Sequence, residues 1–398
     1  MTETIKKMLI CSVLAVSAAA FFIAEAQSAE SKLETMIVTA NKMEENVQNI
    51  PETITVLDGE MLEERGIRNL NELMKQIPNL YSEKTVASAN AMNFRGLQTS
   101  VFTRTNPVVL YIDGIPQSNS YGYEASLVDV ERVEILRGSQ GTIYGKDTIG
   151  GVINIITKKP TNHVEGFVRG EYATDNYMLG TFSLHTPIVK NNLYMSINGQ
   201  FSKDNGWITN QHPGLDKDAN SEKEHNVSST LLYEPTEKLS VRLYVGNESF
   251  RKNWFDGMYL DPSRDIRSAT RDEAENTDYD IDTYTKIKGN SQALNVIYRF
   301  ANMNLTSLTT HKKLNLNANI DYDFGNNPVF DGCAMYQDAS FDTISQELRF
   351  SSTNHDGIRW VGGLYAERDK TENPRYGLCR SEERRVGKEC RSRWSPYH

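Results

Sequence analysis

The sequence has little of two features, long hydrophobic runs and basic charge. Apart from Met8–Ala24 near the N-terminus, no stretch reaches the roughly 18 apolar residues that a membrane-spanning helix needs. The formal net charge is −9, whereas a general nucleic-acid binder needs a basic surface. Hydrophobic residues make up 38%, which is too few for a helical membrane protein but fits a β-barrel whose lumen-facing residues are polar.

The apolar run over Met8–Ala24 is typical of a secretory signal. Two lysines precede it, and Ala24-Glu25-Ala26 offers small residues at the cleavage positions. An uncleaved anchor helix is the alternative, but the run is slightly short for spanning a membrane. Cys11 lies too early in the run for a lipoprotein signal. We therefore expect residues 1–26 to be a cleaved signal peptide and the mature protein to be exported.

Residues 27–50 form an N-terminal extension that contains one β-prone segment. This segment reads Glu34-Thr35-Met36-Ile37-Val38-Thr39-Ala40. An isolated strand beside a flexible chain end is unpaired, so it can add to the sheet of a partner. The alternative is that it is the first strand of a domain.

Residues 51–160 predict a compact α+β domain. We expect a helix after Asp58 that ends at Gly66, and a second helix over 67–77 that Pro78 ends. Asp113-Gly114 predicts a turn. The expected strands cover 54–57, 108–112, 133–136 and 152–157, and the expected outward loops cover 81–92, 97–107 and 117–125.

From residue 163 the pattern changes to long strands in which apolar and polar residues alternate. Leu193, Met195, Ile197 and Phe201 alternate with polar residues, as do Val241, Leu243 and Val245. Short connections near 189–192, 235–238, 301–302 and 354–357 alternate with long polar ones near 208–224, 255–278 and 325–340. This rhythm is typical of a transmembrane β-barrel with short periplasmic turns and long extracellular loops, with about nine strands up to residue 370.

Nine strands cannot close a barrel around a folded domain, because barrels with filled lumens need about 22 strands. An open barrel would expose unpaired backbone to lipid, which is costly. We therefore expect residues 161–379 to be a partial barrel of an incomplete chain. Residues 380–398 are basic and lack alternation, and we expect them to be a non-native tail.

Several motifs occur in a specific order behind the signal. They are ETMIVTA at 34–40, IRNLNELMKQIPNL at 67–80, FRGL at 94–97, VLYIDGIP at 109–116, VERVEILRGSQGTIYGKDTIGGVINIITKKP at 130–160, SQELRFSS at 345–352 and WVGGLYAER at 360–368. With these motifs the chain resembles the TonB-dependent outer-membrane siderophore receptors, in particular the iron-complex group that includes the pesticin/yersiniabactin receptor. The segment at 34–40 lies too close to the mature N-terminus for an added signalling domain.

The resemblance implies an all-β transmembrane barrel, with about 22 strands in the full protein, around an N-terminal α+β plug in the cell outer membrane. It implies active uptake of a ferric siderophore, with residues 34–40 as the TonB box that pairs with TonB, and with ExbB and ExbD acting indirectly. The protein would contact outer-membrane lipid, would not be an enzyme, and would need no resident cofactor because the ligand carries the iron. Uptake of cobalamin or another scarce nutrient is the alternative within the family. A passive porin or adhesin and a secreted carbohydrate-binding protein are alternatives outside it.

The resemblance also implies plug arginines that meet acidic residues on the barrel wall. Here these are Arg95 and Arg137, with Glu347 as the best acidic candidate on a polar strand face. Charge-assisted hydrogen bonds suit a plug that must be released, because water can replace them. For the ligand, aromatic side chains can stack on its rings and an arginine can meet an anionic complex. The candidates are Tyr81, Phe102, Arg104, Tyr121 and Tyr123, and Trp207 and Trp254 are further vestibule or membrane-interface candidates.

Other patterns resemble reactive sites only superficially. The P-loop-like run over 141–146 is one residue short, and Asp278, Asp280 and Asp282 lack the glycine and glutamate of a calcium loop. The histidines have no metal-ligand spacing, and Asp113 with Glu134 is not a supported catalytic pair. Cys333 and Cys379 fall in expected loops that flank one hairpin, so a disulfide is one hypothesis and two thiols are the other.

Overall fold

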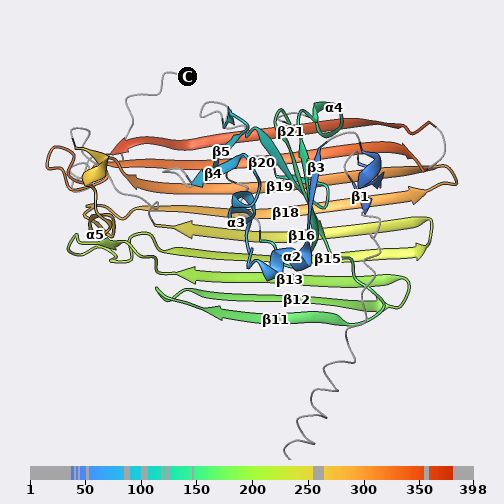
Figure 1. Cartoon of the computed structure of the whole chain (residues 1–398), viewed down its shortest axis with the longest axis horizontal. Helices are drawn as coiled ribbons and strands as arrows, with labels where there is room; N and C mark the ends of the chain where they lie inside the picture. The colour runs from blue at the N-terminus through green and yellow to red at the C-terminus, as the bar shows by residue number, and fades with distance from the viewer. Residues whose placement is uncertain are drawn as a thin grey trace, which may run out of the picture.

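The computed structural model describes residues 37–39, 42–43, 45–50, 53–84, 90–99, 106–117, 121, 126–145, 148–253, 264–353 and 358–379. It has two parts, a wide nine-stranded sheet and a small α+β domain that lies against one face of that sheet (Figure 1). We call the small domain the plug. Among the described residues no helix is long and apolar enough to cross a membrane.

The plug is built on a five-stranded mixed sheet with the order β3-β9-β10-β7-β8. Strands β10 and β7 are parallel, and the other neighbours are antiparallel. The strands are β3 (Ile54–Asp58), β7 (Val108–Ile112), β8 (Ile115–Gln117), β9 (Val130–Arg137) and β10 (Gly151–Thr157). A second sheet contains β4 (Leu80–Lys84), β5 (Asn90–Phe94) and β6 (Leu97–Gln98), and the helices are α2 (Gly59–Glu64), α3 (Leu70–Lys75) and α4 (Gly141–Tyr144).

Local signals in the sequence fix the two longer helices. The Asp58 carboxylate accepts a hydrogen bond from the Met61 amide at 2.7 Å and caps α2, which is followed by Gly66 with a φ of 68°. Helix α3 presents Leu70, Leu73 and Met74 to the sheet, and all three are fully buried. Burial of each such side chain contributes about 1.5–3 kcal/mol, so this face holds α3 on the plug core.

The nine-stranded sheet has its strands in chain order, and each is antiparallel to the next. This confirms the expected count of nine strands. The strands are β11 (Glu165–Tyr172), β12 (Met178–Val189), β13 (Leu193–Asp204), β15 (Glu222–Thr236), β16 (Leu239–Lys252), β18 (Tyr284–Arg299), β19 (Met303–Asp321), β20 (Ala334–Ser352) and β21 (Val361–Cys379). Within the described residues the sheet is open, with β11 and β21 at its edges.

The alternation along the strands separates the two faces of this sheet. On β16 the side chains of Leu243 and Val245 are 43% and 45% exposed, while Ser240 on the opposite face is buried. On β20 Ile344 is 47% exposed and Ser345 is buried. The polar face is the one that the plug covers, so the expected division into apolar and polar faces is confirmed.

The long loops at one end of the sheet fold together. Strands β14 (Thr209–Asn210) and β17 (Asn276–Thr277) pair in parallel, and a small apolar cluster forms around Ile208, Ala219 and Tyr279. The loops also contain η2 (Ile266–Ser268) and α5 (Arg271–Ala274), which has a capping box. The short turns lie at the opposite end of the sheet, the right side of Figure 1, next to β1 (Ile37–Val38).

Three expectations about local structure were wrong. The second helix covers Leu70–Lys75 rather than 67–77, and its cap is Asn69, whose side chain accepts from the Glu72 amide. The expected loop over 81–92 contains most of β4 and the start of β5. The expected long loop over 325–340 is shorter, because β20 begins at Ala334. In each case pairing with a neighbouring strand or a local cap outweighs the sequence pattern.

Candidate functional site

The N-terminal segment, described at residues 37–39, 42–43 and 45–46, is docked on the plug. Its strand β1 pairs with β2 (Glu45–Asn46), and η1 (Val47–Asn49) follows. Val38 is fully buried in a cluster with Leu136 and Val152 of the plug sheet. The expectation of an unpaired strand at this position is therefore corrected for Ile37 and Val38, because burial of Val38 and the pairing with β2 sequester them. Residues 34–36 and 40 lie outside the described part of the chain.

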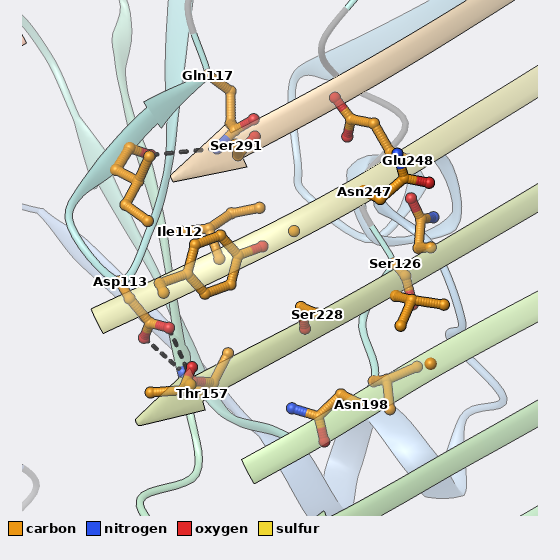
Figure 2. Close-up of a pocket in the computed structure, with 18 of the residues that line it drawn as sticks. Ile112, Asp113, Gln117, Ser126, Thr157, Asn198, Ser228, Asn247, Glu248 and Ser291 are labelled. Carbon is orange, nitrogen blue, oxygen red and sulfur yellow. Dashed lines mark hydrogen bonds between the residues drawn. The ribbon is translucent and has the colours of Figure 1, made fainter. Parts of the chain in front are cut away.

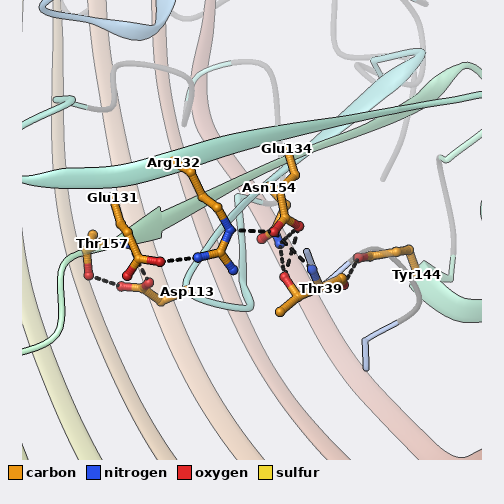
Figure 3. Close-up of polar contacts among 8 residues, drawn as sticks. All are labelled: Thr39, Asp113, Glu131, Arg132, Glu134, Tyr144, Asn154 and Thr157. Carbon is orange, nitrogen blue, oxygen red and sulfur yellow. Dashed lines mark hydrogen bonds and ion pairs between the residues drawn. The ribbon is translucent and has the colours of Figure 1, made fainter. Parts of the chain in front are cut away.

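A buried carboxylate holds the segment immediately after β1 (Figure 3). The Thr39 amide and hydroxyl donate to the two oxygens of Glu134, each at 2.9 Å, and Glu134 is fully buried. Arg132 Nε donates to Glu134 at 2.9 Å, and Asn154 Nδ2 donates to it at 3.1 Å. A buried charge is tolerated only when it is paired and hydrogen-bonded, so Glu134 and its four donors act as one unit.

Two tyrosines complete this contact. The Tyr144 hydroxyl donates to the Thr39 carbonyl at 3.3 Å, and the Tyr111 hydroxyl donates to the Tyr144 carbonyl at 2.8 Å. Burial raises the pKa of both phenols, so both remain protonated donors at neutral pH.

Lys42 connects the segment to the large sheet. Its Nζ lies 2.7 Å from Glu347 Oε2 on β20 and 5.3 Å from the centre of the Tyr144 ring. Burial lowers the pKa of Lys42, while Glu347 opposes this effect. Arg349 also donates to Glu347, at 2.6 Å, so two cations share one carboxylate. A further ion pair joins Glu45 of β2 to Arg359 before β21.

Asp113 anchors the centre of the plug to the sheet. It lies in the β7–β8 turn with a φ of 49°, accepts from the Thr157 amide at 2.9 Å, and pairs with Arg242 of β16. Burial alone would raise the pKa of Asp113, but Arg242 and the Thr157 hydrogen bonds hold that pKa below its usual value. Asp113 is therefore charged and bound at neutral pH.

Other contacts between plug and sheet are also polar or ionic. Arg68 pairs with Glu171 at 2.9 Å, and Glu63 pairs with Arg169 at 3.0 Å. The remaining pairs join Asp129 to His185, Ser126 to Gln200, and Gln117 to Lys312. Among the described residues, two small apolar clusters join the plug to the sheet, one around Tyr121 with Phe341 and one around Ile115 with Leu308. Water can replace most polar contacts of this kind.

A narrow cavity of about 100 Å³ runs through this interface (Figure 2). Asp113, Gln117 and Ser126 line it from the plug, and polar side chains of the sheet line the other side. The buried Asn198 Oδ1 has no hydrogen-bond partner there. A polar cavity of this size can hold water molecules, which ease exchange of the plug–sheet hydrogen bonds.

The structure places the three expected plug–barrel residues in different surroundings. Glu347 does bind a cation outside the sheet, but that cation is Lys42 and not Arg95 or Arg137. Arg95 is exposed in a turn with a φ of 53° and lies against the Phe94 ring, without an ion pair among the described residues. The buried Nε of Arg137 has no hydrogen-bond partner in the described structure. The roles of both arginines therefore remain predictions.

The structure describes only part of the expected ligand-contact set. Tyr81 is 62% exposed on β4, and Trp207 is 43% exposed in a long loop. Tyr121 is only 4% exposed and packs on Phe341 with ring centres 5.5 Å apart, so it contributes to the plug–sheet contact. Its role in ligand contact remains a prediction. Phe102, Arg104, Tyr123 and Trp254 lie outside the described residues.

The aspartates of the acidic loop, Asp278 and Asp280, make contacts with neighbouring loop residues. Asp278 binds His212 and Asn326, and Asp280 accepts from the Gly332 amide, so these carboxylates serve loop contacts. In the part of the chain that the structure describes, no group of three or more His, Cys, Asp or Glu side chains is placed to hold a metal ion.

Cys333 is buried just before β20, and the register pairs its neighbour Ala334 with Cys379. The two cysteine positions are thus close in the sheet, and the disulfide remains a prediction.

The sequence does not single out the most connected residues of the site. Its patterns do not mark Lys42 or Asn154, and they assign no chemistry to Asp113 and Glu134. A weak signal exists, because Glu134 and Asn154 each interrupt an apolar strand of the plug. A polar residue in a buried strand needs a partner, but the sequence does not show that the partner is Thr39.

Comparisons with known proteins agree with this geometry. Residues 46–152 match the family described as "TonB-dependent Receptor Plug Domain". The pesticin receptor of Yersinia pestis is 32% identical over 198 residues, which are 49% of this chain and 29% of that protein. The iron-regulated outer membrane virulence protein of Vibrio cholerae is 34% identical over 165 residues, which are 38% of this chain and 24% of that protein.

The fold is also found among solved structures. The ferric yersiniabactin uptake receptor of Yersinia pestis has a TM-score of 0.72 at 23% identity, over 83% of this chain and 50% of that one. The Pseudomonas aeruginosa ferripyoverdine receptor has a TM-score of 0.67 at 17% identity, over 83% and 44% of the two chains.

Residues 46–152 thus match the plug domain of TonB-dependent receptors, and the chain shares its fold with a solved receptor for a ferric complex. In sequence it is similar to the pesticin receptor, and in fold it is similar to the yersiniabactin receptor. The matched region covers 29% of the pesticin receptor and 50% of the yersiniabactin receptor structure.

Proposed function

We propose that the protein takes up a ferric siderophore across the outer membrane with energy supplied through TonB. The observation that carries this proposal is the docking of the N-terminal segment, which Thr39 ties to Glu134 of the plug and Lys42 ties to Glu347 of the sheet. A force applied to residues 34–40 would therefore act on the plug and on its attachment to β20. Strand addition to TonB would use the same backbone edge that β1 now offers to β2.

The chemistry of the interface favours transport over catalysis. The contacts that hold the plug are ion pairs and hydrogen bonds that water can replace. One chain of contacts, from Asp129 to His185 to Ser196, has the residue types of a hydrolase triad. Ser196 is only 4% exposed and faces the plug contact, so it offers no nucleophile to a substrate. We infer that iron travels as part of the ligand and that the protein needs no resident cofactor.

Uptake assays on the complete gene test this proposal. Cells that lack their own receptors would express the gene with and without TonB, and would be given labelled ferric siderophores or labelled cobalamin. We expect ferric siderophore uptake that requires TonB. Uptake that is indifferent to TonB would contradict the mechanism, and TonB-dependent uptake of cobalamin alone would replace the proposed substrate.

A pair of variants separates strand addition from docking. Val38→Pro removes a backbone donor and should abolish uptake, because proline interrupts strand pairing. Val38→Ala weakens the same buried contact but keeps the donor, so uptake should be retained. Equal loss in both variants, at equal receptor levels, would argue against strand addition through Val38.

A further inference from the structure

A second, larger cavity lies between the plug and the short-turn end of β18, β19 and β20. Its volume is about 410 Å³, within the range of roughly 300–1,000 Å³ that is common for small-ligand sites. The N-terminal segment forms part of its wall, through Thr39, Lys42 and Met43. Figure 3 shows the plug side of this wall, with Thr39, Arg132, Tyr144 and Asn154. Removal of the segment would therefore enlarge the cavity.

The cavity lining is rich in cations. Six basic residues line it, against two acidic ones. Arg132 is paired with Glu131 and Glu134, and Arg359 with Glu45. The basic residues are Lys42, Arg132, Lys159, Arg299, Arg349 and Arg359, and the acidic ones are Asp113 and Glu347.

The positive charge is not fully compensated. Lys42 and Arg349 both bind the single carboxylate of Glu347, at 2.7 and 2.6 Å. Asp113 is already paired with Arg242, which lies outside this cavity lining. Lys159 is exposed and has no ion pair in the described part of the chain. The docked state therefore has a local excess of positive charge.

Unsatisfied groups also line this cavity. Among the described residues, the buried Arg349 Nε and the side-chain oxygens of Asn295 and Asn304 have no hydrogen-bond partner. A buried donor without an acceptor is uncommon in folded proteins. An oxygen of an anionic ligand would bind the guanidinium of Arg349, which lines the cavity, and its charge would offset the excess cations.

We propose that this cavity is an anion-binding exit site for the cargo, and that Lys42 makes its charge depend on the docked N-terminal segment. The ligand class is an anionic ferric complex, which would place a carboxylate or phenolate oxygen against Arg349. Withdrawal of the chain as far as Met43 removes Lys42 and leaves Glu347 to neutralise Arg349, while the pair of Glu45 with Arg359 stays in place. The cavity then loses one cation beside Arg349 and part of its wall together, which releases the anion. This inference rests on the proposed function.

Charged thiol reagents measure the cavity potential directly in the full receptor. Asn304→Cys places a thiol on the cavity wall and breaks no side-chain acceptor bond of Asn304, since its Oδ1 has no partner. The probes are a sulfonate-bearing and a trimethylammonium-bearing methanethiosulfonate. The rate at which each reagent modifies the introduced thiol is divided by its rate of reaction with a small free thiol. The receptor without the introduced thiol gives the background rate.

We expect the normalised rates to favour the sulfonate. Lys42→Gln or Arg349→Gln, each added to Asn304→Cys, should lower this preference about five-fold, as expected for the loss of one charge about 8 Å away in a water-filled space. Lys238→Gln is the matched control, because Lys238 is an exposed cation of a short turn that does not line the cavity. Absence of a sulfonate preference, or a preference that neither change lowers, would overturn the proposal.

The uptake assay separates this proposal from the proposed function. In a receptor that transports, Arg349→Gln should slow uptake of an anionic ferric complex several-fold while binding of that complex to whole cells stays unchanged. Unchanged uptake would overturn the exit role. If the receptor transports nothing in the TonB test, the proposed function fails, yet the reagent rates still decide whether the cavity selects anions.

Discussion

At the scale of residues, the contact between the N-terminal segment and the plug is concentrated on Glu134. This carboxylate is fully buried and accepts hydrogen bonds from Thr39, Arg132 and Asn154. Hydrogen bonds to a charged group contribute about 1.5–3 kcal/mol, more than most neutral ones. One residue of the plug therefore contributes a large part of the resistance to withdrawal of the segment.

Glu134→Gln should loosen the N-terminal segment without unfolding the plug. The amide side chain can accept only through its single oxygen, so the Thr39 amide and hydroxyl cannot both be satisfied. We expect the Thr39 amide to exchange about 10-fold faster in hydrogen-exchange mass spectrometry, which corresponds to about 1.4 kcal/mol. Glu131→Gln is the control, since the Glu131 side chain is 42% exposed. Unchanged exchange at Thr39 would show that Glu134 does not hold the segment.

Asp113 determines how the stability of the plug–sheet attachment depends on pH. Its pKa in the folded protein lies below the ordinary aspartate value of 3.8, so its stabilising effect is complete above that value and is lost as the pH falls through the lowered pKa. The attachment to Arg242 should therefore be constant between about pH 5 and 8 and weaken only in strong acid. Thermal unfolding of the purified receptor and of Asp113→Asn across this range tests the prediction. A midpoint difference that changes between pH 5 and 8 would contradict it.

At the scale of elements, strand pairing brings together residues that are distant in the chain. Strands β20 and β21 pair over most of their lengths, from Ala334 with Cys379 to Ser351 with Val361. The polar face of β20 supplies Glu347 and Arg349 to the N-terminal segment, more than 300 residues earlier in the chain. The β-strand alternation predicts which face these residues occupy, but only the sheet order places them opposite Lys42.

The pairing of β20 with β21 also brings two cysteine positions close together, which favours a disulfide. Ala334 lies opposite Cys379, so Cys333 is one position from that pair, and export allows disulfides to persist. We expect a Cys333–Cys379 disulfide that joins the loop ends of β20 and β21. Mass mapping of a digest made without reductant should recover the linked peptides. Recovery of both peptides alkylated before any reduction would refute the bond.

At the scale of the whole molecule, the plug is held against the sheet by separate polar contacts spread over its surface. They extend from Glu63 with Arg169 near β11 to Lys42 with Glu347 on β20. Partly exposed ion pairs contribute about 0–1 kcal/mol each, so no single surface pair fixes the plug. The attachment depends on their number, and a local pull can break them one after another.

The two motif arginines give a further test at this scale. Arg95→Ala combined with Arg137→Ala should loosen the plug and reduce uptake several-fold, because the family resemblance implies that both arginines meet acidic residues on the barrel wall. The measurement is uptake at matched receptor levels, together with protease sensitivity of the plug. The nearby exposed Arg65→Ala is the control. Normal uptake by the double variant would remove these arginines from the release mechanism.

Much of the architecture could be predicted from the sequence because it follows from local rules. Period-two alternation predicts the strands and their two faces, and Asp58 with Gly66 predicts the limits of the first plug helix. The motifs between residues 67 and 160 predict the plug. The order of short turns and long loops predicts which end of the sheet lies next to β1.

The tertiary structure alone decided which polar residues meet. Thr39 and Glu134 are 95 residues apart, and Lys42 and Glu347 are 305 residues apart. Such contacts depend on how the plug lies against the sheet, and no local pattern encodes that arrangement. The sequence therefore determined the elements and the family resemblance of this protein, whereas only the packed fold showed how its N-terminal segment is held.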